Sequence, residues 1–153
     1  MHLIKGAPDR VSVTTNAKAL ADQLDNDGYF GLGKSGGAGI SRSQLFAFAM
    51  ALGYESGNPA PLVNTYSGGF IREDSFDGRL LALMYCEYLC QLGEDEIDRI
   101  TEKSNLYKLA EQYANSGMMQ LQTWKDSIDS ETLLYDMLIR LDELYDRNVA
   151  AGV

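Results

Sequence analysis

The chain has 153 residues, of which 45% are hydrophobic and 23% are charged, and its net charge is −9. These values are typical of one globular domain that is large enough to bury a core. They exclude a disulfide framework, because there are only two cysteines, and a transmembrane helix, because no apolar run approaches ~20 residues. The first ten residues contain no signal-peptide core, so we expect a cytoplasmic protein without membrane contact.

Charge is unevenly distributed along the chain. Residues 94–153 contain 13 acids and 6 bases, whereas residues 1–42 contain 4 acids and 5 bases. An acidic surface repels the phosphate backbone of nucleic acids. We therefore expect that only the N-terminal third of the chain could bind DNA directly.

Residues 10–14, RVSVT, alternate polar and apolar side chains and include two β-branched valines. This pattern predicts a short strand with one buried face. Thr14 or Thr15 is then expected to cap a helix over residues 16–26. The strand has no evident partner elsewhere in the chain, which predicts pairing with a second copy in a homodimer.

Residues 28–39, GYFGLGKSGGAG, contain six glycines and predict a loop. The part from Gly28 to Ser35 matches the phosphate-binding pattern G-x-x-x-x-G-K-[ST]. That pattern binds phosphate between a buried strand and a helix N-terminus, but here an acidic helical segment precedes it and further glycines follow it. The alternatives are a plain loop and a backbone nest that binds an anion or a nucleotide phosphate. The residues of such a nest would be Gly33, Lys34, Ser35 and Arg42.

Residues 41–53, SRSQLFAFAMALG, contain eight consecutive apolar residues that are rich in strong helix formers and lack β-branching. They predict a buried helix, with Ser41 or Ser43 as its N-terminal cap and Gly53 as its end. A helix that is apolar on all sides must be surrounded by other elements. We therefore expect this helix to be the centre of the fold.

The remaining sequence predicts helices joined by links. Residues 55–69 contain two of the three prolines and are interpreted as a connection, followed by a short extended piece at residues 70–73. Helical periodicity then marks further helices, two of which are expected to end at Gly93 and Gly117. Their ranges are 75–92, 94–101, 105–115, 118–128 and 130–149.

Together these elements predict a mainly α-helical single domain over residues 1–153, with about six helices around the buried central helix and at most one short N-terminal strand. Within it, residues 1–69 would contain the strand, the first helix, the glycine-rich loop and the central helix. Residues 70–153 would form an acidic helical bundle.

No set of residues has the spacing of a catalytic site. His2 is the only histidine, which excludes a histidine-based triad and a multi-histidine metal cluster. Glu73, Asp74 and Asp77 fit no calcium-loop spacing and are interpreted as solvated capping residues. We therefore expect no enzyme activity, no cofactor and no bound metal.

The predicted helix at 75–92 contains one glutamate and two cysteines whose surroundings its periodicity suggests. Glu87 is interpreted as a solvated or interface residue, and Cys86 and Cys90 as small residues in or beside the core. The helices also contain many tyrosines, a residue type that favours protein interfaces because its ring is buried while its hydroxyl stays wet. This composition favours a protein partner.

The strand at 10–14, the helix from Asn16 and the Ser41-Arg42-Ser43 start of a second helix resemble a ribbon-helix-helix module. The order of elements, with FAFAMALG and then FIREDSFDGRLLAL, is also similar to the small DndE-like helical subunit of bacterial DNA phosphorothioation systems. The resemblance covers residues 9–85 and departs from the first family in its longer inter-helix loop. It implies a DNA-facing surface made of Arg10, Ser12, Thr14 and Lys18.

These observations lead to three hypotheses about function. The first is a non-enzymatic binding protein, a small accessory subunit or regulator of a larger assembly that acts on DNA, as in modification or phage defence. The second is a DNA-binding protein of the ribbon-helix-helix type. The third is a nucleotide- or anion-binding protein that uses the loop from Gly28 to Ser35.

Overall fold

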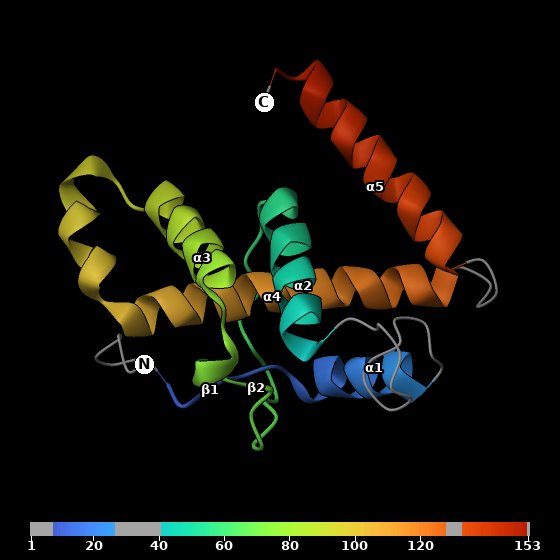
Figure 1. Ribbon diagram of the computed structural model, residues 1–153, viewed down its shortest axis with the longest axis horizontal. Helices are drawn as coiled ribbons and strands as arrows, with labels where there is room; N and C mark the ends of the chain where they lie inside the picture. The colour runs from blue at the N-terminus through green and yellow to red at the C-terminus, as the bar shows by residue number, and fades with distance from the viewer. Residues whose placement is uncertain (1–7, 27–40, 128–132, 153) are drawn as a thin grey trace. The chain divides into compact units, whose positions relative to one another are not determined.

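The computed structural model describes residues 8–26, 41–127 and 133–152 (Figure 1). The chain divides into two compact units, unit 1 (residues 1–120) and unit 2 (residues 121–153). The fold is mainly α-helical with one two-stranded ribbon, as the sequence predicts, and no helix in these ranges is both long and apolar enough to cross a bilayer. The elements are β1 (Arg10–Val11), α1 (Thr15–Asn26), α2 (Arg42–Ser56), β2 (Ile71–Arg72), α3 (Gly78–Gln91), α4 (Lys103–Ser127) and α5 (Leu133–Ala150), with 3₁₀ helices η1 (Glu73–Ser75) and η2 (Glu94–Thr101).

The N-terminal strand finds its partner within the chain. β1 pairs antiparallel with β2, so that Arg10 lies opposite Arg72 and Val11 lies opposite Ile71. Further backbone hydrogen bonds extend this pairing, including one from the Tyr66 N–H to the Val13 carbonyl at 2.9 Å. The expectation of an unpaired strand was therefore wrong, and with it the reason for a dimer built on that ribbon. The partner strand lies in the predicted extended piece at residues 70–73, and the further hydrogen bonds extend into the segment interpreted as a connection.

The alternation along the strand is confirmed. Val11 and Val13 are buried, whereas Arg10 is exposed and Ser12 is half-buried. The next helix also begins as expected, because the Thr14 hydroxyl accepts the Ala17 N–H at 3.1 Å and so satisfies a free donor of the first turn of α1.

Helix α2 begins at the predicted place and ends later. Ser41 caps it, since its side chain accepts the Gln44 N–H while the Gln44 side chain accepts the Ser41 N–H. The helix then continues through Gly53 to Ser56, and Gly57 adopts the left-handed conformation, with φ of 73°, that ends it. The prediction that Gly53 is the stop was wrong because Gly53 is inside the helix.

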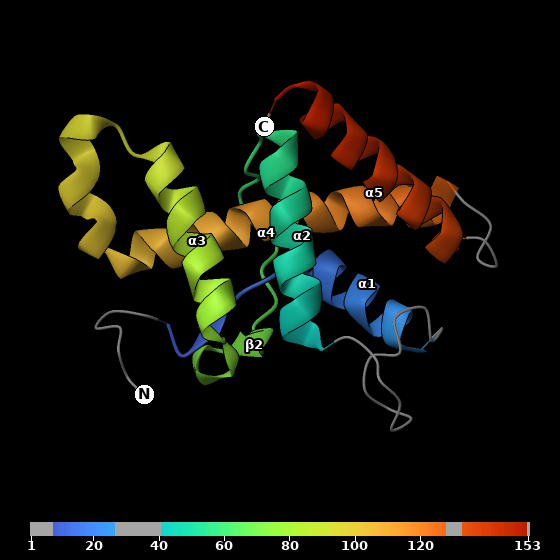
Figure 2. The same ribbon diagram turned by 45° about the horizontal axis from the view of Figure 1, so that its top comes forward.

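Helix α4 runs through Gly117 as one continuous helix, although the sequence predicted a break there. Both glycines lie where α2 crosses α4, which Figures 1 and 2 show as two helices crossing in unit 1. A glycine at a close crossing allows two helix backbones to approach. In the sequence alone, such a glycine cannot be distinguished from one that ends a helix.

The core of unit 1 is built around α2. The Phe46 ring lies 6.1 Å from the Phe76 ring, and the Phe76 ring lies 6.0 Å from the Tyr107 ring of α4. α2 is buried along most of its circumference but not on all sides, because Ala47 is half-buried and Ala51 and Tyr54 are exposed. This open face of α2 positions the candidate site.

Unit 2 consists of the end of α4 and α5. Trp124 is buried, and the Arg140 guanidinium lies over its ring at 5.4 Å from the centroid, within the range of a cation–π contact.

A candidate protein-binding face on α2 and α3

Helices α2 and α3 lie side by side and run in the same direction (Figures 1 and 2). On α2, the side chains of Ala47, Ala51 and Tyr54 follow one another at spacings of four and three residues. On α3, a second set repeats the same spacings at Leu83, Glu87 and Cys90. Residues spaced in this way lie along one side of a helix. We call these six residues, together with the pocket described next, the α2–α3 face.

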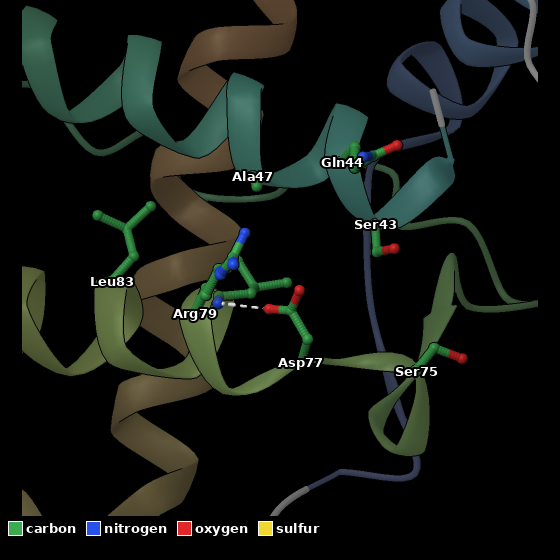
Figure 3. Close-up of a pocket in the computed structure, with 8 residues that line it drawn as sticks. Ser43, Gln44, Ala47, Ser75, Asp77, Arg79 and Leu83 are labelled. Atoms are coloured by element: carbon green, nitrogen blue, oxygen red, sulfur yellow. Dashed lines mark hydrogen bonds between the residues drawn. The ribbon is translucent and has the colours of Figure 1, made fainter. Parts of the chain in front are cut away.

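A pocket of about 210 Å³ opens at the N-terminal ends of the two helices (Figure 3). Ala47 from α2 and Leu80 and Leu83 from α3 give it apolar walls. Its polar edge is formed by Ser43, Gln44, Ser75, Asp77 and Arg79.

Two of the polar groups at the pocket edge already have roles as helix caps. Asp77 accepts the Leu80 N–H at 2.8 Å, drawn as a dashed line in Figure 3, and Gln44 takes part in the cap of α2. Arg79 differs, because it forms no ion pair with any residue in the described ranges. In Figure 3 its side chain reaches from α3 toward Ala47. The pocket therefore combines apolar walls with one free cation.

One helical turn beyond Leu83, Glu87 is buried without a partner. Its side chain is only 3% exposed, and neither carboxyl oxygen has a hydrogen-bond partner among the residues that the structure describes. Burial raises the pKa of Glu87 from 4.5 to about 7, because removing the carboxylate from water disfavours its charged form. Of the two alternatives for Glu87, a solvated residue was wrong, and an interface residue stays a prediction.

Three side chains near this carboxyl group interact with it or with one another, namely Tyr54, Tyr113 and Cys90. Tyr54 of α2 and Tyr113 of α4 meet edge to face, with ring centroids 5.4 Å apart. A hydrogen bond with Cys90, followed by burial and the negative charges nearby, Glu87 included, raises the pKa of Tyr54 to about 12. Burial, followed by the charges of Glu87 and Cys90, also raises the pKa of Tyr113. Glu87 thus lies where α2, α3 and α4 meet.

The two cysteines lie on the outside of α3. Both are free and exposed, so the expectation that they belong to the core was wrong. The side chains of Leu83 and Leu89 on the same helix are also more than a third exposed. The part of α3 that faces away from the core therefore carries apolar and thiol side chains in place of the charged ones that usually cover an exposed helix.

The predicted anion-binding set lies mostly outside the described residues, which do not include Gly33, Lys34 and Ser35. Arg42 is described, and its guanidinium lies 3.4 Å from Asp22 and over the Phe70 ring. Lys18, from the predicted DNA-facing set, also pairs with Asp22, at 2.6 Å. The structure therefore brings Lys18 and Arg42, from two different predicted sites, to one carboxylate.

The other predicted DNA-facing residues separate into two roles. Thr14 is the cap of α1, whereas Arg10 and Ser12 line a second pocket against α4. No group of three or more His, Cys, Asp or Glu side chains in the described ranges could bind a metal ion.

Comparison with known proteins found no matching family model, no matching curated protein and no matching solved structure.

Proposed function

We propose that this chain is a non-enzymatic binding protein, an accessory subunit that holds a segment of a partner protein on its α2–α3 face. The observation that supports this most is Glu87. A buried polar group without a hydrogen bond is destabilising, and nearly all such groups in proteins have a partner. Both carboxyl oxygens are covered by the chain's own side chains, so a partner segment would have to displace some of these to bring a donor to Glu87. The same segment would cover the exposed apolar side chains around it.

The face specifies the chemistry of the segment that would fit it. Apolar side chains would cover Ala51 and Leu83, a hydrogen-bond donor would reach Glu87, and an acidic side chain would meet the free guanidinium of Arg79. Arg79 and Glu87 are eight residues apart on α3, which corresponds to about 12 Å along a helix. An amphipathic helix with an acid and a donor about two turns apart has this arrangement.

A role in a system that acts on DNA is a second candidate, and one observation favours it. Arg10 and Arg72 are both exposed and lie opposite each other on the ribbon, and Arg10 forms no ion pair with any residue in the described ranges. Nothing in the described residues favours the third hypothesis, nucleotide binding by the loop from Gly28 to Ser35.

Site-specific photo-crosslinking in the cells that produce the protein tests the proposal. A photo-reactive phenylalanine analogue would replace Leu83 in one variant and the exposed Gln23 of α1 in a control. We expect one discrete protein adduct from position 83 and none from position 23. The adduct should also disappear when Ala51→Glu is added, because a charge would then face the apolar segment. Identical adducts from both positions, or none from position 83, would contradict the proposal.

A further inference from the structure

We propose that a pocket between the N-terminal strand and α4 binds a phosphate-bearing ligand. The pocket has a volume of about 330 Å³, near the lower end of the range for ligand sites. Arg10 and Ser12 line one side of it, and Ser104, Lys108 and Glu111 of α4 line the other. All of these residues belong to unit 1.

Two cations in this pocket have no carboxylate partner. Neither Arg10 nor Lys108 forms an ion pair with any residue in the described ranges. Arg10 also lies directly opposite Arg72, whose guanidinium pairs with Asp74 at 2.8 Å. Asp74 therefore compensates the charge of Arg72, whereas an anion bound in the pocket would compensate the charge of Arg10.

The donors around the pocket fit a phosphate group. A guanidinium and an ammonium both form strong charge-assisted hydrogen bonds with phosphate oxygens. The hydroxyl groups of Ser12 and Ser104 add two donors, and neither makes a hydrogen bond within the described ranges. A phosphate monoester presents three acceptor oxygens in different directions, which suits donors that come from a strand on one side and a helix on the other.

Glu111 is the one carboxylate that lines the pocket in the described ranges. Its carboxylate accepts the Ser12 N–H at 2.7 Å, so one oxygen is held against the strand. Its charge opposes a bound anion. Glutamine at this position would keep an oxygen for the Ser12 N–H and would remove the charge.

Chemical-shift titration of the labelled full chain tests the site. The probes are sodium phosphate, a deoxynucleoside monophosphate and a short single-stranded DNA, each compared with sodium chloride at matched ionic strength. We expect saturable shifts in the amides of residues 10–12 and 104–111. Arg10→Gln and Lys108→Gln should each weaken binding about tenfold, because each removes a charged hydrogen bond. Glu111→Gln should strengthen it several-fold, and Arg147→Gln, which removes an exposed arginine of α5 in unit 2, should leave it unchanged.

The three probes distinguish the source of the phosphate. If sodium phosphate binds, the ligand of the pocket is the free phosphate ion. If only the nucleotide or only the DNA binds, the ligand is the phosphate group of a larger molecule. Each of these results supports the site if the two weakening substitutions act as described. No saturable shift with any probe, or binding that survives both substitutions, would overturn the proposal. Lys108 lies within α4 and outside the ribbon, so Lys108→Gln still tests the site if Arg10→Gln disturbs the pairing of β1 with β2.

Discussion

Gly53 of α2 and Gly117 of α4 lie against each other where the two helices cross. A Cβ atom on Gly53 would be 3.1 Å from the Gly117 nitrogen and only 1.9 Å from the Tyr113 carbonyl oxygen. A Cβ atom on Gly117 would be 1.7 Å from the Ala49 carbonyl oxygen. Neither contact can be relieved by a side-chain rotation, because the obstructing atoms are backbone. The crossing therefore requires glycine on both helices.

Alanine at either glycine should destabilise the protein, because the helices must move apart and loosen the core. We expect Gly53→Ala and Gly117→Ala each to lower the free energy of unfolding by about 3 kcal/mol, which corresponds to roughly 10 °C in Tm. Thermal unfolding followed by circular dichroism measures this.

Gly78 provides the matched control for this experiment. It is the first residue of α3, and nothing lies within 4 Å of an added Cβ atom. Gly78→Ala should leave Tm unchanged or raise it slightly, because alanine is the better helix former. Equal losses at all three glycines would mean that the close crossing does not exist.

The stability of the protein should depend on pH through Glu87. Its folded-state pKa is raised to about 7 from 4.5, so the folded state holds a proton that the unfolded state releases. The free energy of unfolding therefore falls as the pH rises from about 4.5 to about 7 and then levels off. Glu87→Gln, which cannot ionise, should match the natural protein near pH 5 and exceed it by up to about 3 kcal/mol at pH 8.

Urea unfolding of the two proteins across this pH range measures the difference. Other titrating groups, such as Glu111, are present in both proteins and cancel in the comparison. A difference that stays constant from pH 5 to pH 8 would mean that Glu87 is charged and solvated in the folded state.

Both thiols should react in the native protein, because Cys86 and Cys90 are exposed on α3. A chromogenic disulfide reagent should consume two thiols per chain without denaturant, and urea should reveal no more. Cys86→Ser and Cys90→Ser should each leave one reactive thiol. Thiols that react only after unfolding would place these residues in the core instead.

The helices could be predicted because their signals are local. The alternation of residues 10–14, the caps at Thr14 and Ser41, and the periodicity of the later segments depend on neighbours in the sequence. The roles of Gly53 and Gly117 could not be predicted in the same way. Low helix propensity makes a glycine look like a stop, and only the approach of another helix shows that its lack of a side chain is needed.

The candidate site was partly visible in the sequence. Glu87 lies seven residues after Leu80 and three after Met84, both buried, so helical spacing alone places it on the apolar side of α3. The prediction of a solvated Glu87 instead followed the general rule that acidic side chains are exposed to water. The pocket that contains Arg10 and Ser12 could not be predicted, because Ser104, Lys108 and Glu111 are about a hundred residues away and meet them only in the folded chain.

The pKa of the Glu87 carboxyl group, measured by carbon-detected NMR, tests the account most directly. Glu87→Gln identifies the resonance, and the titration would be repeated on the complex with the partner that the photo-crosslinking experiment identifies. We predict a pKa of about 7 in the free protein, because the group is buried without a donor. The pKa should be clearly lower in the complex, because the partner's donor would favour the charged form. A pKa near 4.5 in the free protein, or a value that the partner leaves unchanged, would contradict the proposal that a partner protein on the α2–α3 face supplies a hydrogen-bond donor to Glu87.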